Sequence, residues 1–160
     1  MTSKKSLLQA ELKQTKPFPT PAAEASVAIM KTADLVRRAL DNVIETQGVT
    51  GQQYNVLRIL RGAGENGIPT LEIIDRLIEQ TPGITRLLDR LEAKQLVRRE
   101  RCASDRRQVL CWITPAGLAL LSKLDKPVNE TDVRVLAGLN AKEIRALIEI
   151  LEKVRGGRAD

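Results

Sequence analysis

The chain has 160 residues, of which 42% are hydrophobic and 29% charged, the composition of a globular protein. It contains no histidine, no Cys-x-x-Cys pair and no phosphate-binding glycine loop, which argues against a histidine base, a zinc site of that type and nucleotide hydrolysis. We therefore expect neither an enzyme nor a protein with a cofactor or a metal ion. The net charge is +6, and residues 81–107 hold eight basic and four acidic side chains, which favours a polyanionic partner.

Residues 1–19 are predicted to form a flexible basic arm, because the first 16 residues carry four lysines and one glutamate and a Pro-Phe-Pro sequence follows. The arm lacks the apolar segment of a secretory signal, and no apolar run in the chain approaches the roughly 18 residues of a membrane span. Two cysteines do not make a disulfide framework. The sequence therefore predicts a cytoplasmic protein without a membrane partner.

A long helix is predicted within residues 20–49. Thr20 followed by Pro21 is a helix-start signal, since a hydroxyl caps the first turn and proline suits the first helical position. Apolar residues recur at helical spacing as far as Ile44, and Gly48 is expected to end the helix.

Residues 50–114 have the pattern of a winged helix-turn-helix. Thr50 opens a Thr-x-x-Gln capping box at the start of one helix. Thr70 is expected to cap a short second helix, and the sequence Gly-Ile-Pro-Thr before it has room for one edge pairing of a sheet. Thr81 and Pro82 repeat the helix-start signal and predict a third helix.

This third helix is expected to be the recognition helix. Its apolar residues form one stripe, so Arg86 points away from the core and Thr85 and Arg90 lie on the flanks. In a helix-turn-helix, such residues of the recognition helix reach base edges in the major groove. The strands "LVRRERC" and "QVLCWIT" then surround a tip with Arg106 and Arg107, which is typical of a wing that reaches a minor groove.

Residues 115–155 are predicted to form two C-terminal helices, followed by a tail at residues 156–160. Thr114 and Pro115 start the first of these helices, and Asn140 and Glu143 cap the second. Within the first helix, Pro127 is expected to kink or interrupt the backbone because its ring removes a hydrogen-bond donor.

The predicted fold class is mainly α (α+β), a winged helix-turn-helix with long N- and C-terminal dimerisation helices. A winged helix needs only residues 50–114, so the apolar faces of the flanking helices require another partner. A symmetric homodimer provides that partner and matches a palindromic DNA site.

Four stretches resemble the multiple-antibiotic-resistance regulator (MarR) family of bacterial transcription factors, and the resemblance covers roughly Ala22 to Val154. "VTGQQYNVLRIL" resembles the family's Thr-x-x-Gln-x-x-Val-Leu helix, and "ITRLLDRLEAKQLVRR" resembles its recognition helix and first wing strand. "SDRRQVLCWITPAG" resembles its wing motif, and "LAGLNAKEIRALIEILEKV" resembles its closing dimerisation helix. The combination is specific, whereas each stretch alone would be weak.

The resemblance implies a nucleoid-associated homodimer that binds double-stranded DNA at pseudo-palindromic operators, usually as a repressor. It also implies a small phenolic or anionic ligand that lowers DNA affinity. Asp105 is expected to brace a wing arginine, since a carboxylate repels phosphate, and Thr81 is expected to cap the recognition helix and donate to a phosphate. The residues expected to bind DNA are Thr81, Pro82, Thr85, Arg86, Arg90, Arg106 and Arg107.

Three points stay open at the level of sequence. Tyr54 and Trp112 are candidates for the wall of a ligand pocket, although Trp112 is also suited to packing on arginine stems. If the hairpin turns at Arg106–Arg107, Cys102 and Cys111 lie nearly opposite each other, so a redox-responsive regulator is an alternative to two packed thiols. A winged-helix module that binds a protein and no DNA is a second alternative.

Overall fold

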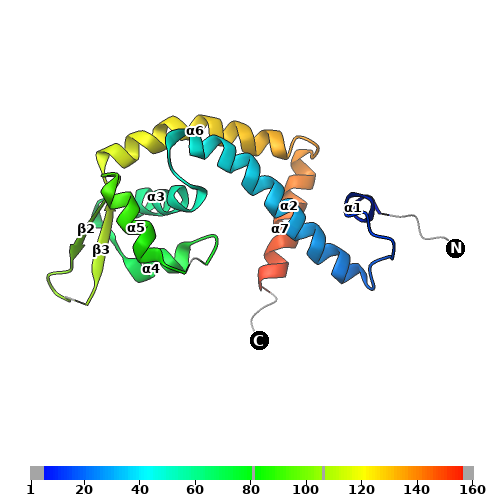
Figure 1. Ribbon diagram of the computed structural model, residues 1–160, viewed down its shortest axis with the longest axis horizontal. Coiled ribbons are helices and arrows are strands. Elements are labelled where there is room, and N and C mark those ends of the chain that lie inside the picture. The colour runs from blue at the N-terminus through cyan, green and yellow to red at the C-terminus, as the bar shows by residue number, and fades with distance from the viewer. Residues whose placement is uncertain (1–5, 81, 106, 157–160) are drawn as a thin grey trace. The chain divides into compact units, whose positions relative to one another are not determined.

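Helices follow one another along most of the chain, and a small sheet interrupts them. A computed structural model describes residues 6–80, 82–105 and 107–156, which divide into two units, 1–39 and 40–160, treated separately below. Figure 1 labels the α-helices and the strands β2 and β3. The helices are α1 Leu7–Glu11, α2 Pro21–Ile44, η1 Glu45–Gln47, α3 Gly51–Ala63, η2 Gly64–Asn66, α4 Thr70–Arg76, α5 Ile84–Ala93, α6 Pro115–Val135 and α7 Ala141–Gly156, and the strands are β1 Ile68–Pro69, β2 Val97–Arg101 and β3 Val109–Ile113.

The first unit contains α1 and most of α2. The hydroxyl of Ser6 and the amide of Gln9 form a capping box that starts α1, inside the segment expected to be a flexible arm. Gln9 is buried, and its side-chain amide donates to the carbonyl of Lys16 at 3.3 Å. The predicted start of α2 is confirmed, because the hydroxyl of Thr20 accepts a hydrogen bond from the amide of Ala23 at 3.1 Å. Flexibility of the arm stays a prediction.

The connection from α2 to α3 has the predicted chemistry. After η1 the chain turns at Gly48, whose φ of +72° is left-handed and favours glycine. Thr50 and Gln53 then exchange hydrogen bonds of 3.2 Å and 3.1 Å at the start of α3. This capping box satisfies main-chain groups that a helix end leaves without partners.

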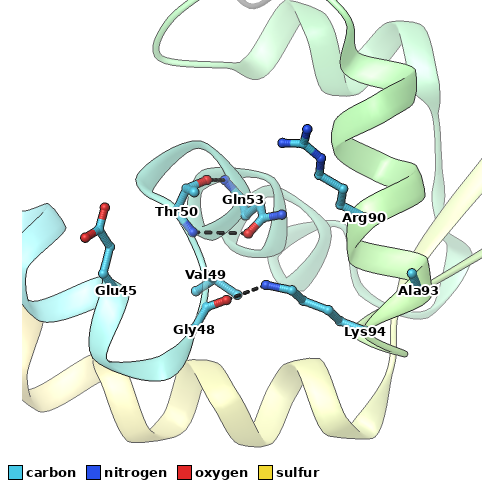
Figure 2. Close-up of a pocket in the computed structure, with 8 residues that line it drawn as sticks. All are labelled: Glu45, Gly48, Val49, Thr50, Gln53, Arg90, Ala93 and Lys94. Atoms are coloured by element: carbon cyan, nitrogen blue, oxygen red, sulfur yellow. Dashed lines mark hydrogen bonds between the residues drawn. The ribbon is translucent and has the colours of Figure 1, made fainter.

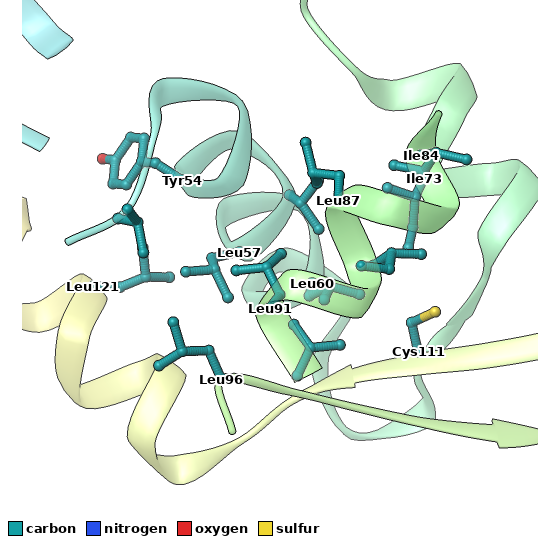
Figure 3. Close-up of a cluster of buried hydrophobic side chains, with 14 of the residues drawn as sticks. Tyr54, Leu57, Leu60, Ile73, Ile84, Leu87, Leu91, Leu96, Cys111 and Leu121 are labelled. Carbon is teal, nitrogen blue, oxygen red and sulfur yellow. The ribbon is translucent and has the colours of Figure 1, made fainter. Parts of the chain in front are cut away.

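The second unit has an aliphatic core between α3, α5, α6 and the sheet (Figure 3). Leu57 of α3, Leu88 of α5 and Leu121 of α6 are at most 1% exposed, and each such burial contributes roughly 1.5–3 kcal/mol before conformational costs. Cys111 of β3 is fully buried among them. The fully buried side chains of the core fix α5 on the sheet and so determine which face of α5 remains at the surface.

The sheet has three antiparallel strands in the order β1-β3-β2. The edge pairing foreseen at Gly-Ile-Pro-Thr is present, since Ile68 pairs with Cys111 and Pro69 with Leu110. Together with α3, α4 and α5, the sheet forms a winged helix-turn-helix, which confirms the predicted fold class.

Two predicted helix starts are wrong. Thr70 is the first residue of α4 and not its cap, because Pro69 occupies the cap position and the Thr70 hydroxyl donates to the carbonyl of Val109 at 3.3 Å. The recognition helix α5 begins at Ile84, two residues later than the Thr-Pro signal indicates. Its cap position is taken by Gly83 at φ +94°, a left-handed backbone that Pro82 cannot adopt. Thr81 lies outside the described residues.

The C-terminal helices begin where the sequence predicts. Thr114 accepts a hydrogen bond from the amide of Gly117 at 3.1 Å, and Asn140 and Glu143 cap α7 reciprocally. Of the kink or interruption expected at Pro127, the interruption is wrong, since α6 is continuous through this residue, and a kink stays a prediction. Buried neighbours on either side, Leu124 and Val128, pack into the core and hold the helix together despite the missing donor. Within the described residues, no helix is both long and apolar enough to cross a membrane.

Candidate nucleic-acid interface

The surface of α5 carries the residues predicted to read DNA. Ile84, Leu87, Leu88 and Leu91 are buried, so the helix turns Thr85, Arg86, Asp89 and Arg90 outward, all of them exposed. Pro82 is also exposed in the turn that precedes the helix. The recognition helix therefore presents two arginines with little intrachain cover.

The connection between α4 and α5 is held from α3. The side-chain oxygen of Asn55 accepts a hydrogen bond from the amide of Ile78 at 3.1 Å. This bond satisfies a main-chain donor just beyond α4, where the chain leaves the helical path at Leu77. The first helix of the winged domain thus helps to set the position from which α5 departs.

The wing is the hairpin of β2 and β3 (Figure 1). At its tip, the carboxylate of Asp105 accepts a hydrogen bond from the main-chain amide of Arg107 at 3.0 Å, and the carbonyl of Asp105 accepts from the amide of Gln108 at 2.9 Å. Asp105 therefore supports the backbone of the turn, and the Arg107 side chain is exposed. Arg106 lies outside the described residues.

Arg99 joins the wing to the recognition helix. Its guanidinium lies 2.6 Å from a carboxylate oxygen of Asp89 and 2.5 Å from one of Glu92, both on α5. These hydrogen bonds, the one to Glu92 first, raise the pKa of Arg99. Nothing in the spacing of charges along the sequence predicts this cluster, although it is the main ionic contact described between wing and helix.

Trp112 lies at the base of the wing and is held by three contacts. Its indole N–H donates to the carbonyl of Glu65 at 3.0 Å, and its ring covers Gly67 so closely that a Cβ there would be 2.4 Å from a ring carbon. The guanidinium carbon of Arg98 lies 4.3 Å from the ring centroid, a cation–π geometry. Packing of Trp112 on an arginine is therefore confirmed.

The two cysteines are not opposite each other, so that expectation is wrong. Cys111 pairs with Arg99 in the strand register, whereas the amide of Cys102 donates to the carbonyl of Gln108. Three steps along an antiparallel ladder correspond to about 10 Å, beyond the roughly 7 Å within which a disulfide forms. Both are free thiols, and their pKa values move in opposite directions: burial raises that of Cys111, while the Ser104 hydroxyl lowers that of Cys102.

A hollow of about 470 Å³ lies between the start of α3 and the C-terminal half of α5 (Figure 2). Arg90 borders it, and the ammonium of Lys94 donates to the carbonyl of Gly48 across it. The two candidate pocket residues lie elsewhere. Trp112 is at the wing base, and Tyr54 is buried in the core with its hydroxyl accepting from Arg58 at 3.1 Å.

Within the described residues, no group of His, Cys, Asp or Glu is arranged to hold a metal ion.

Lys94 is a further residue that the sequence did not single out. A lysine at the C-terminal end of a helix, here at the C-cap position of α5, is common because it interacts favourably with the helix dipole, so nothing in the sequence marked it as special.

An exposed arginine-bearing helix beside a hairpin with a basic tip defines a winged-helix DNA-binding protein. The sequence model of a protein family, described as the MarR family, matches residues 47–108 of this chain. The MarR transcription factor from Planctomyces limnophilus has 38% identity and a TM-score of 0.66, over 85% of this chain and 98% of that one. The chain belongs to the MarR family, and it is a DNA-binding regulator and not an enzyme.

Two further solved structures are similar. A mutant MarR from E. coli complexed with operator DNA has 25% identity and a TM-score of 0.75, over 93% of this chain and 98% of that one. Bordetella bronchiseptica BpsR, whose DNA binding is regulated by 6-hydroxynicotinic acid, has 23% identity and a TM-score of 0.73, over 82% of this chain and 98% of that one. At 23% identity, the similarity to BpsR shows a shared fold alone.

Proposed function

We propose that the protein is a homodimeric repressor, located with the nucleoid in the cytoplasm, which binds a pseudo-palindromic operator and is released from it by a small anionic or phenolic ligand. The observation that carries the proposal is the exposure of Arg86 and Arg90 on α5 next to a wing with an exposed Arg107. The E. coli relative complexed with operator DNA supports it.

The residues have separate roles in this proposal. Thr85, Arg86 and Arg90 of α5 enter the major groove, where an arginine pairs best with guanine. Thr81 and Pro82, which precede α5 in the sequence, contact the sugar-phosphate backbone of the DNA in this proposal. Arg106 and Arg107 place positive charge at the minor groove, and Asp105 keeps the turn in shape.

The homodimer is inferred from apolar faces that the single chain leaves uncovered. Not one residue of α7 is buried in the chain, although the helix carries Ile144, Leu147, Ile148 and Leu151 on one face. On α2, Ile29 is 41% exposed and Leu35 is 55% exposed. An obligate dimer that covers such faces buries on the order of 2,000 Å² or more.

The hollow beside α5 is the place proposed for the ligand. Its volume suits a small aromatic acid, and Arg90 and Lys94 supply two positive charges against the single negative charge of Glu45. The start of α3, capped by Thr50, adds the positive end of a helix dipole. Regulation of BpsR by 6-hydroxynicotinic acid supports an acid of this kind.

Selection of bound genomic DNA fragments tests the function. A repressor is expected to enrich a few palindromic fragments that overlap promoters, and deletion of its gene is expected to raise expression from them. The alternative interaction module would enrich no fragment, and it would show no steep salt dependence on any duplex, which phosphate contacts always produce. An enriched fragment whose promoter weakens on deletion would instead indicate an activator.

A further inference from the structure

Arg99 is the covered member of its ion cluster, and the two carboxylates are the members open to solvent. The Arg99 side chain is 19% exposed, whereas those of Asp89 and Glu92 are 54% and 40% exposed. Two nitrogens of Arg99 reach the same oxygen of Glu92, at 2.5 Å and 3.0 Å, and one of them also reaches Asp89. Because the arginine faces α5 and is largely covered, it is poorly placed to contact a separate molecule.

The recognition helix has no net charge of its own. It contains two arginines, one aspartate and one glutamate. Asp89 is exposed between Arg86 and Arg90, the residues proposed to enter the major groove. A duplex carries one negative charge per about 1.7 Å of axis, so an uncompensated carboxylate at this position would repel it.

We propose that Arg99 is a positioning residue for DNA binding, which neutralises Asp89 and Glu92 so that the recognition helix approaches the phosphates without repulsion, while Arg99 itself does not touch the DNA. The inference rests on the proposed function. Its alternatives are that Arg99 is only a mechanical brace between wing and helix, or only one more positive charge near the duplex.

The first experiment compares Arg99→Gln with Arg98→Gln. Arg98 is the next residue of the same strand, is 51% exposed, and pairs with Glu100 and the ring of Trp112. Both variants lose one positive charge from β2, and each is titrated with an enriched genomic fragment and a scrambled duplex at several salt concentrations. Neutralisation predicts that Arg99→Gln weakens binding to both duplexes about tenfold at low salt, and that Arg98→Gln changes binding less than about twofold. Equal losses would mean that only the charge count matters, which overturns the proposal.

The second experiment removes the carboxylates. Asp89→Asn combined with Glu92→Gln is expected to bind at least as tightly as the wild type, and adding these two changes to Arg99→Gln is expected to restore its affinity. A brace predicts the opposite, because the double variant also breaks the link and the triple variant cannot recover. The loss in Arg99→Gln should also shrink as salt rises, since charge repulsion is screened within about 8 Å at physiological salt and a broken brace is not.

Two further measurements keep the result interpretable. Arg99→Lys retains the charge with a different hydrogen-bond geometry, so it is expected to keep near wild-type affinity, and a tenfold loss in this folded variant would favour the brace. Thermal melting shows whether each variant is folded. If the wild type binds no duplex at all, the proposed function fails. If the wild type binds and Arg86→Ala weakens binding while Arg99→Gln does not, only the role of Arg99 fails.

Discussion

Replacing Arg86 and Arg107 separately by alanine should divide base recognition from general DNA affinity. Arg86 is exposed on α5 and makes no ion pair within the part of the chain that the structure describes, so its loss leaves no buried intrachain charge unpaired. A bidentate contact to guanine is worth about 1–3 kcal/mol. Because each 1.4 kcal/mol is tenfold, Arg86→Ala should weaken the cognate site by about 5- to 150-fold and a scrambled duplex far less.

Arg107 should behave differently because of its position. It is exposed at a turn held by Asp105, at the end of a hairpin and not on a helix that fits the major groove. Its loss should weaken many sequences evenly and lower the slope of log affinity against log salt by about one unit. Fluorescence anisotropy with both duplexes at several salt concentrations measures both quantities.

A control variant removes a positive charge from α6, outside the proposed DNA-binding surface. Lys126 of α6 is 85% exposed and pairs only weakly, at 3.8 Å, with Glu130. Lys126→Ala should therefore leave both affinities nearly unchanged. If Arg86→Ala and Arg107→Ala lower cognate and scrambled binding in the same ratio, the separation of roles is wrong, and if neither lowers binding, this surface is not the DNA interface.

Four further outcomes are expected. Gly67→Ala should unfold more easily than Gly64→Ala in a denaturant titration, because both glycines have a positive φ but only a Cβ at Gly67 meets the indole ring; equal destabilisation would refute the contact. Asp125→Asn should cost at most about 1 kcal/mol near neutral pH, since the pair with Arg61 is half-exposed. The Arg61 hydrogen bond lowers the pKa of Asp125 below 3.8, so the difference in stability should vanish as the pH falls through and below that value; a difference that persists there would exclude the ion pair. Mild peroxide should leave DNA affinity unchanged, and a thiol-reversible loss that disappears in Cys102→Ser would restore the redox hypothesis. Ile148→Glu should convert the dimer to a monomer in sedimentation at micromolar concentration, whereas a wild-type monomer near 17.7 kDa would contradict the dimer itself.

The features that the sequence predicted well are those decided within a few residues. The capping boxes at Thr50 and Asn140 need only a side chain and an amide three residues away, and both are present. The apolar stripe of α5 needs only helical periodicity, and it correctly predicted the exposure of Arg86. Such local rules were enough to place the recognition helix and its outward face.

The features that were missed depend on how distant segments meet. A hairpin turning at Arg106–Arg107 would place Cys102 opposite Cys111, but the turn is longer and Cys102 meets Gln108, which moves the register by three residues. The ion cluster of Arg99 needs this register together with the position of α5 above the sheet, and neither is encoded in the spacing of charges. The start of α5 at Ile84, with Gly83 at the cap position, likewise depends on the path of the turn and not on the Thr-Pro signal alone.

Arg90 belongs both to the proposed DNA-binding surface and to the proposed ligand site. It lies four residues after Arg86 on the exposed side of α5 and also borders the hollow, and Lys94 follows it by a further four residues. One face of the helix therefore extends from the proposed DNA contact to the proposed ligand site. Where both roles hold, an anion paired with Arg90 withdraws that side chain from the major groove and competes with the contact between Lys94 and Gly48. Because such coupling is reciprocal, operator DNA must weaken ligand binding by the same factor by which the ligand weakens DNA binding. Factors clearly different from one, measured on one preparation, would show that the two sites are coupled, since two independent sites would give a factor of about one in each direction.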